Sequence, residues 1–358
     1  MKKRSFYNKF GRINRRKFVK YGAFSIATSL VTACSNNRQA QTDTSSPSSP
    51  ITVGKMEKVV ASWLPVMQTI AYYVALEEKL FELAGIEVES VKFENPNQIV
   101  DSLLSGRADF GPPGAVAGIT VLAEARAPGS FKVFGLQGGG IKTNFVNDAL
   151  IVKPDSLITS FKDLKGKTIG VIPGIQGKTI TQYVLRQNGL DPAQDVRIEQ
   201  IAVALHLPAV VAGTVDATFS LEPVGSIAVA TKQGKQAITN AASMFICDPF
   251  YSGAAVLSSK FIKERPEVAK KVVQVIDEAT RMANENFDKY RPILAKYTAI
   301  KLDQVQYIAQ PRLRAFKDLD ATDIDSYQKF VDIFYKEGVL KKTMDVRSLL
   351  LDGSAIAI

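Results

Sequence analysis

The chain has 358 residues, of which 46% are apolar and 22% are charged, and its formal net charge is +10. These values are typical of a globular protein, exclude a collagen-like chain, and leave room for two domains with separate cores. Nine of the positive charges lie in residues 1–34, which contain no acidic residue, so the rest of the chain carries only +1. The basic balance therefore gives no reason to expect a nucleic-acid partner, and we expect none.

The N-terminal segment has the organisation of an export signal. Residues 1–20 are basic, and Tyr21–Ala33 is a stretch of 13 apolar and small residues. This stretch is too short to span a bilayer comfortably and suits the core of a signal peptide. Asn14–Lys20 resembles the twin-arginine export signal, with the general secretory route as the alternative.

Cys34 closes this segment. The run Val31–Cys34 resembles the bacterial lipobox, in which the cysteine is lipidated and becomes the first mature residue. The alternative is ordinary cleavage after alanine beside an unmodified cysteine, but we favour lipidation because Cys34 stands directly at the end of the apolar stretch. Residues 1–34 are thus predicted to be a signal peptide with a lipobox. Residues 35–56, which begin with a run rich in Ser, Thr, Asn, Gln and Pro, are predicted to be a disordered tether.

The remaining cysteine and the single histidine exclude several kinds of site. If Cys34 is acylated, Cys247 has no disulfide partner, and we expect it to be a small buried apolar residue. His206 stands at a predicted helix start, where we expect a capping or surface role. One histidine gives almost no support for a Ser–His–Asp triad or a multi-histidine zinc site, so we expect neither a metal nor a cofactor.

The body alternates strand-like and helix-like segments. This alternation predicts an α/β fold with parallel sheets and helices on both faces. The main predicted strands cover residues 58–62, 88–93, 108–110, 131–136, 149–152, 168–172 and 254–258. The main predicted helices cover residues 69–83, 97–104 (with Asn95 as N-cap), 115–126 and 180–188, and residues 266–345 are largely helical in pattern.

Two parts of the body resemble each other. Leu103–Phe110 and Val210–Phe219 share an apolar pair, a small residue, Gly, two residues and Asp, and their glycines lie 107 positions apart. Upstream, helices ended by Gly85 and Gly189 each precede a strand, and these glycines lie 104 positions apart. Further upstream, the strand-like residues 59–63 correspond to residues 168–172. Three landmarks therefore agree in order and spacing, which favours two similar lobes over coincidence between ordinary βαβ units. We place lobe I at residues 57–148 plus 254–358 and lobe II at residues 149–253.

A cleft is expected between the lobes. Ligands of open α/β sheets lie beyond the carboxyl ends of the strands. This rule places four loops around one cleft, at residues 62–68, 111–114, 174–179 and 220–223.

The body resembles the solute-binding proteins of ABC importers, in the nitrate, sulfonate, taurine and thiamine-precursor group. The segments that carry the resemblance are Ser160–Lys167, Gly106–Gly111, and Gly213–Ala217 followed by Glu222-Pro223, and it covers about residues 57–345. It implies a two-lobed, periplasmic-binding-protein-like (type II) clamp that closes on a small-molecule ligand. The implied partners are an ABC permease with its ATPase subunits, and the membrane that holds the lipid anchor. The implied location is the periplasmic side of a bacterial cell envelope.

The resemblance also implies ligand-binding positions. Alkanesulfonate binders hold the anion with main-chain amides and hydroxyls at helix starts, where N–H groups and partial positive charge are available. Residues 111–114, with Pro113 and Gly114, match the first anion loop, and residues 174–179 match the second. This chain departs from the pattern because Pro112 and Pro113 lack N–H groups and the second loop lacks the usual Gly-Ser pair.

Individual side chains complete the predicted ligand site. Ser62 and Trp63 stand at a strand end, where Trp63 forms either a pocket wall or part of the core. Glu222 suits a cationic or amine-bearing ligand, with a helix-cap or hinge role as the alternative. The other candidates are polar residues of the loops, which could equally be solvated, and one aromatic residue that could instead belong to the core: Gln68, Gln176, Gly177, Lys178, Thr179 and Tyr251.

Three readings of the function stay open at this point. The first is a substrate-binding lipoprotein that captures a small organic anion of the sulfonate or taurine type, with nitrate or bicarbonate second and a pyrimidine or aromatic amine third. The second is an enzyme similar to the thiamine-pyrimidine synthases, which is disfavoured by the single histidine and the export signal. The third is a lipoprotein sensor without a transport role.

Overall fold

The structure is a computed structural model, and it describes residues 56–112 and 117–356. The predicted signal peptide with Cys34 and almost all of the predicted tether lie outside the described residues, as do Pro113 and Gly114. No helix within the described ranges is long and apolar enough to cross a membrane.

The first sheet has six strands in the order β11-β4-β10-β3-β1-β2. The strand β1 pairs in parallel with β2 and β3, whereas β10 runs antiparallel to β3 and β4, and β11 runs antiparallel to β4. The chain therefore enters this sheet in its first part and returns to it about a hundred residues later. The strands are β1 (Glu57–Trp63), β2 (Ile86–Lys92), β3 (Phe110–Gly111), β4 (Phe131–Gly139), β10 (Phe250–Ser258) and β11 (Arg312–Arg314).

The second sheet has five strands in the order β7-β6-β8-β5-β9. The strand β6 pairs in parallel with β7 and β8, and β5 runs antiparallel to β8 and β9. All of its strands come from one continuous part of the chain, between β4 and β10. They are β5 (Asp148–Val152), β6 (Lys167–Val171), β7 (Val196–Gln200), β8 (Ala217–Leu221) and β9 (Lys235–Thr239).

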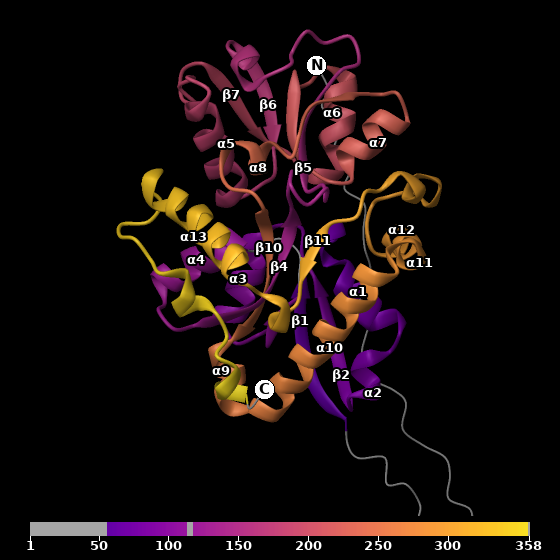
Figure 1. The fold of residues 1–358 in the computed structure, drawn as a ribbon, viewed down its shortest axis with the longest axis vertical. Helices are drawn as coiled ribbons and strands as arrows, with labels where there is room; N and C mark the ends of the chain where they lie inside the picture. Colours follow the sequence, from indigo (N-terminus) through magenta and orange to yellow (C-terminus); the bar gives the residue numbers. More distant parts are fainter. Residues whose placement is uncertain (1–55, 113–116, 357–358) are drawn as a thin grey trace, which may run out of the picture. The chain divides into compact units, whose positions relative to one another are not determined.

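Helices cover both faces of the first sheet (Figure 1). The helices α1 (Ile70–Glu77) and α10 (Pro266–Glu285) bury their apolar residues against one face of this sheet. The core that they form with it includes Val59, Tyr72 and Val272. The helices α3 (Pro96–Leu104), α4 (Ala117–Arg126) and α13 (Ala321–Lys336) pack in another core with Val256 and Phe250. This two-sheet arrangement confirms the predicted α/β class.

The remaining helices support the second sheet or link the C-terminal part. Those around the second sheet are α5 (Ile175–Gln187), α6 (His206–Ala212), α7 (Val224–Ala230) and α8 (Ala241–Phe245). The others are α2 (Leu80–Leu83), α9 (Ser259–Glu264), α11 (Phe287–Tyr290) and α12 (Leu294–Tyr297). Short 3-10 helices include η1 (Met67–Thr69), η3 (Val203–Leu205) and η5 (Leu302–Tyr307).

Several predicted boundaries match the structure, and the predicted N-cap of α3 is confirmed. The Asn95 side chain accepts a hydrogen bond from the Asn97 N–H, and Gln98 completes a capping box. The single predicted helix over residues 69–83 is wrong, because Lys79 adopts a left-handed conformation (φ 55°) that separates α1 from α2. An apolar pattern that continues through both helices conceals such a break.

The glycine run at residues 138–140 is largely part of a strand. Gly138 and Gly139 lie in β4, which extends three residues beyond its predicted end. A Cβ atom on Gly138 would lie 1.8 Å from the Phe250 carbonyl oxygen, and one on Gly139 would lie 2.7 Å from the Asn147 nitrogen. These glycines are required by the close approach of neighbouring backbone, which a single sequence does not distinguish from flexibility.

The positions of β4 and β10 show where the chain passes between the sheets. The first passage leads from Gly139 to Asp148, and the second from Thr239 to Phe250. The strand β10 begins at Phe250 in the first sheet, four residues before its predicted start. The assignment of residues 57–148 plus 254–358 and 149–253 to two moving lobes stays a prediction.

Candidate functional site

Three adjoining cavities lie along the carboxyl ends of strands from both sheets. The α5 cavity (about 50 Å³) adjoins the start of α5, the middle cavity (about 340 Å³) lies beside it, and the Glu222 cavity (about 440 Å³) contains that side chain in its wall. The first two share Pro96, Ile172, Pro173 and Leu221, and the last two share Pro65, Val66, Val203, Ala204, Thr298 and Ala299. These shared walls make one cleft of the three cavities.

The cleft takes its walls from both sheets. Residues that follow β1, including Pro65 and Val66, come from the first sheet, and residues that follow β6 and β8, including Ile172 and Leu221, come from the second. The connection between α12 and η5 adds residues 298–301. Residues from three of the four predicted loops line the cleft, at 62–68, 174–179 and 220–223, whereas the described residues Gly111 and Pro112 of the fourth loop do not.

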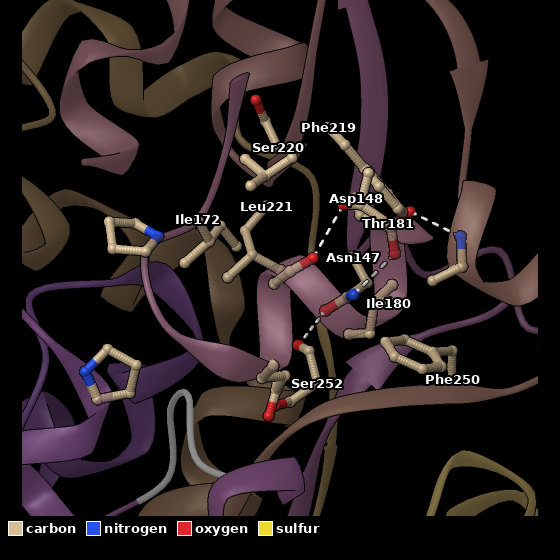
Figure 2. Close-up of a pocket in the computed structure, with 16 residues that line it drawn as sticks. Asn147, Asp148, Ile172, Ile180, Thr181, Phe219, Ser220, Leu221, Phe250 and Ser252 are labelled. Atoms are coloured by element: carbon tan, nitrogen blue, oxygen red, sulfur yellow. Dashed lines mark hydrogen bonds between the residues drawn. The ribbon is translucent and has the colours of Figure 1, made fainter. Parts of the chain in front are cut away.

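The start of α5 forms one end of the cleft (Figure 2). Gln176 and Gly177 line the α5 cavity together with Thr181 one turn later. Gly177 leaves no room for a side chain, since a Cβ atom there would lie 2.3 Å from the Ile172 carbonyl oxygen. The prediction of a loop over residues 174–179 is wrong, because Gly174 is the N-cap and the helix already begins at Ile175.

The Gln176 side chain connects α5 to the first-sheet part of the molecule. Its Oε1 accepts a hydrogen bond of 2.7 Å from the Gly118 N–H in α4, and its Nε2 donates one of 2.9 Å to the Ser252 carbonyl in β10. A second link between these parts is the ion pair of Arg186 in α5 with Glu337 after α13. The structure thus holds the α5 end of the cleft closed.

A buried polar network lies behind the α5 cavity, where β5 begins. Asp148 accepts hydrogen bonds from the Ala242 N–H (2.9 Å) and from the Asn147 Nδ2 (2.8 Å). Asn147 in turn accepts a hydrogen bond of 2.9 Å from the Ser252 hydroxyl, and its own N–H donates to Asn240 Oδ1. Figure 2 shows Asn147 and Ser252 beside the cavity, with Asp148 joined to the same network.

Burial changes the protonation of Asp148. The side chain is only 2% exposed, and loss of solvation raises the pKa of its carboxyl to about 6, although the hydrogen bonds from Ala242 and Asn147 oppose the rise. A carboxyl group in this position is therefore close to half-protonated in mildly acidic solution.

Glu222 is a second buried carboxyl in the cleft. It follows β8, is 1% exposed, and accepts hydrogen bonds from the Ser226 N–H (3.1 Å) and the Gln236 Nε2 (3.3 Å). Burial raises the pKa of Glu222, and the negative charge of Asp148 adds to the rise. Of the predicted ligand-binding residues, Gln176, Gly177 and Glu222 line the cleft.

Gln68 is fully buried beside Met67, a wall residue of the Glu222 cavity. Neither Nε2 nor Oε1 of Gln68 has a hydrogen-bond partner within the part of the chain that the structure describes. An amide buried without partners costs on the order of 1–3 kcal/mol. Among the described residues, Gln68 does not line the three cavities, so its ligand-binding role stays a prediction.

The structure places three other predicted site residues in the core. Ser62 is buried and accepts a hydrogen bond from the Ser102 hydroxyl. The Trp63 indole N–H donates to the Ser90 hydroxyl (2.7 Å), and its ring packs edge-on against Tyr73.

Tyr251 points toward β11 and α13. Its hydroxyl donates to Asp323 and accepts a hydrogen bond from Arg312. Within the described residues, Ser62, Trp63 and Tyr251 do not line the three cavities.

The two remaining loop residues lie on other faces of α5. Thr179 is buried and Lys178 is exposed, and neither lines the three cavities among the described residues. Pro113 and Gly114 lie outside the described residues. The ligand-binding role of each of these positions stays a prediction.

The sequence analysis missed Asn147, Asp148 and Ser252. A signal existed, because Asn147 and Asp148 stand directly before the apolar strand residues 149–152, and polar side chains beside a buried strand need hydrogen-bond partners. Their mutual contacts depend on residues about a hundred positions apart, which the sequence does not bring together.

The histidine and the second cysteine are both buried. The expected capping or surface role of His206 is wrong: its Nδ1 contacts the Ser220 hydroxyl and its Nε2 contacts the Ile201 carbonyl. Burial lowers the pKa of His206 to about 4. The expected burial of Cys247 is confirmed. Within residues 56–112 and 117–356, no cluster of three or more His, Cys, Asp or Glu side chains could hold a metal ion.

A family model described as NMT1/THI5 like matches residues 66–289. The chain belongs to the NMT1/THI5-like family. A protein named as a binding protein of Brucella abortus (strain 2308) is 24% identical over 291 residues, which cover 78% of this chain and 85% of the relative. The 4-amino-5-hydroxymethyl-2-methylpyrimidine phosphate synthase THI13 of Saccharomyces cerevisiae is 24% identical over 230 residues, which cover 61% of this chain and 64% of the relative.

Solved structures of solute-binding proteins share the fold. The periplasmic aliphatic sulphonate-binding protein SsuA of Escherichia coli aligns with a TM-score of 0.66 and 18% identity, over 83% of this chain and 92% of SsuA. The periplasmic nitrate-binding protein NrtA of Synechocystis PCC 6803 aligns with a TM-score of 0.64 and 14% identity, over 82% of this chain and 85% of NrtA. At these identities the likeness establishes the fold, and the predicted resemblance to this group is confirmed.

We expect the Asp148→Asn variant to change the pH dependence of stability. The folded chain holds the Asp148 proton more tightly than the unfolded chain, so this group lowers the free energy of unfolding as the pH rises from about 4 to about 6. The amide variant removes that loss. It keeps an oxygen that accepts from the Ala242 N–H. The Asn147 amide can rotate by half a turn, so that its oxygen accepts from the new amide and its nitrogen donates to the Ser252 hydroxyl.

Urea denaturation at pH 4 and pH 7 measures this effect. From pH 4 to pH 7, the free energy of unfolding of the variant should rise by up to about 3 kcal/mol relative to that of the wild type, because burial raises the pKa of Asp148 from 3.8 to about 6. Asp155→Asn, at an exposed position, is the control and should follow the wild type. Identical pH profiles for Asp148→Asn and the wild type would contradict the assignment.

Proposed function

We propose that the chain is the substrate-binding lipoprotein of an ABC importer. In this role it captures a small organic anion of the sulfonate or taurine type in the cleft and delivers it to a permease with ATPase subunits. The observation that carries the proposal is the cleft itself, whose walls come from strand ends of both sheets. A ligand held there contacts both parts and so can stabilise their closed arrangement.

The anionic group of the ligand would lie at the start of α5. A helix of 13 residues presents N–H groups and partial positive charge at this end, and Gln176 and Gly177 line the α5 cavity. The volumes of the middle cavity (about 340 Å³) and the Glu222 cavity (about 440 Å³) favour an organic ligand over nitrate or bicarbonate. A water molecule has a share of only ~30 Å³ of the liquid, and nitrate is not much larger.

Binding is favoured over catalysis. The yeast relative is named as a 4-amino-5-hydroxymethyl-2-methylpyrimidine phosphate synthase, so an enzyme is the alternative. The resemblance to such enzymes implies a cofactor-linked lysine and a histidine-rich site. The only histidine here is buried against Ser220 and Ile201, where it can serve neither as a ligand nor as a general base without disturbing the core. A yellow cofactor absorbance in the purified protein would favour the enzyme.

The lipid anchor and the envelope location are part of the proposal. Lipidation of Cys34 would hold the body on the periplasmic side of the membrane after export by the twin-arginine route, with the general secretory route as the alternative. We expect the wild-type chain to sediment with membranes, and the Cys34→Ser variant to be released into the soluble periplasmic fraction. Membrane association that persists in the variant, after the leader is removed, would contradict the anchor.

A ligand carried through purification tests the binding function. We expect native mass spectrometry of the full-length lipoprotein, extracted in mild detergent, to show an added mass that matches a sulfonate or another small organic acid. Loss of this mass on unfolding identifies it as non-covalent. If no mass is carried and a thermal-shift screen of sulfonates, inorganic anions and heteroaromatic amines raises Tm with none of them, the proposal is wrong.

A further inference from the structure

We propose that Glu222 is the recognition point for a protonated amine, or a similar cationic N–H donor, carried by the ligand. This inference rests on the proposed function, because it concerns the ligand of the same cleft. It adds that the ligand carries a basic nitrogen as well as any acidic group held at α5.

The position of Glu222 is the first step of the argument. Its carboxyl lies in the wall of the largest of the three cavities, of about 440 Å³, yet only 1% of the residue is exposed. The Ser226 N–H and the Gln236 amide each donate to one of its oxygens. The Ser226 hydroxyl is also hydrogen-bonded to the carboxyl group. A carboxylate has about four lone-pair sites, so these three donors leave capacity for one further donor.

The second step is that Glu222 has no cationic partner. Within the part of the chain that the structure describes, no lysine, arginine or histidine forms an ion pair with it. The negative charge of Asp148 acts on it instead and raises its pKa. A buried carboxylate without a counter-charge destabilises the fold, and a cationic group in the cavity would relieve that cost.

The distribution of charge in the cleft points the same way. Lys301 lines the Glu222 cavity but is exposed. Lys92 and Lys296 line the middle cavity, and each already pairs with a glutamate, Glu94 and Glu77 respectively. The lysines thus lie at the edge or are neutralised, while the carboxyl group is buried inside.

The rest of this cavity is apolar and suits the carbon skeleton of a ligand. Its wall includes Met67, Leu207, Val224 and Ile300. The combination of apolar walls and one buried carboxylate fits a small organic amine better than an inorganic ion.

A pair of ligands that differ by one amino group tests the inference. Isothermal titration of the full-length lipoprotein with 2-aminoethanesulfonate and with ethanesulfonate should show at least tenfold tighter binding of the amine. Glu222→Gln should abolish this preference. The variant can keep its hydrogen bonds to Ser226 and Gln236. The Gln236 amide can rotate by half a turn so that its oxygen accepts from the new amide, and the Thr239 hydroxyl then accepts from Gln236 instead of donating to it. Glu89→Gln, at an exposed position of β2 outside the three cavities, is the matched control and should retain the preference.

Ligand-free stability provides an independent readout. Removal of an uncompensated buried charge should leave the Tm of ligand-free Glu222→Gln at neutral pH equal to or above that of the wild type. A marked fall in Tm would overturn the inference, because it would show that the negative charge is satisfied within the protein.

The remaining outcomes separate this inference from the proposed function. Equal binding of the two sulfonates, a preference that survives Glu222→Gln, or a carried ligand without nitrogen would overturn the amine and leave solute binding intact. Glu222-dependent binding of propylamine alone would support the amine and count against an acidic ligand. If the protein carries no added mass and binds none of the three probes, both the amine inference and the proposed solute binding are contradicted.

Discussion

The fold depends on how two passages of the chain between the sheets hold each other. The first passage ends at Asn147 and Asp148, and the second begins at Asn240. The Asn240 N–H donates to the Asp148 carbonyl (2.7 Å), and its side chain bonds the Asn147 N–H (2.9 Å) and the Phe145 carbonyl (3.0 Å). The Asp148 carboxylate then receives the Ala242 N–H. Because the two passages are cross-linked by buried hydrogen bonds, the sheets are joined by one paired connection.

This connection also shapes the cleft. The same Asn147 and Asp148 that join the passages line the α5 cavity, and Leu221, opposite Asp148 in the pairing of β5 with β8, directly precedes Glu222. Polar groups that hold the structure together therefore also set the charge inside the cleft. Two buried carboxyl groups face the interior, and burial raises the pKa of both. Apolar side chains such as Ile172, Leu207 and Val224 form much of the remaining wall. A ligand that carries both an acidic and a basic group would match both ends of such a cleft.

The sequence predicted features that depend on local patterns. Asn95 was identifiable as an N-cap because its side chain acts on the helix start next to it. The strand and helix order followed from apolar periodicity and from glycine helix ends. The position of the cleft followed from topology, since strand ends of an α/β sheet lie together.

The sequence did not predict features that depend on distant contacts. Trp63 stands at a strand end beside the cleft loops, yet its indole turns to Ser90, 27 residues away. The tie of Tyr251 to Arg312 and Asp323 spans more than 60 residues. The role of Gly138 depends on the Phe250 carbonyl, which no local pattern indicates. Such pairings require the tertiary structure, because residue type alone fits both a core and a pocket wall.

Hydrogen–deuterium exchange of the full-length lipoprotein, with and without the ligand that it captures, tests the central claim most directly. The account predicts slower exchange on binding in segments from both sheets: residues 64–67 after β1, the first turn of α5, residues 221–226 after β8, and residues 298–301. Protection confined to one sheet, or located away from these four segments, would contradict capture of the ligand in the cleft.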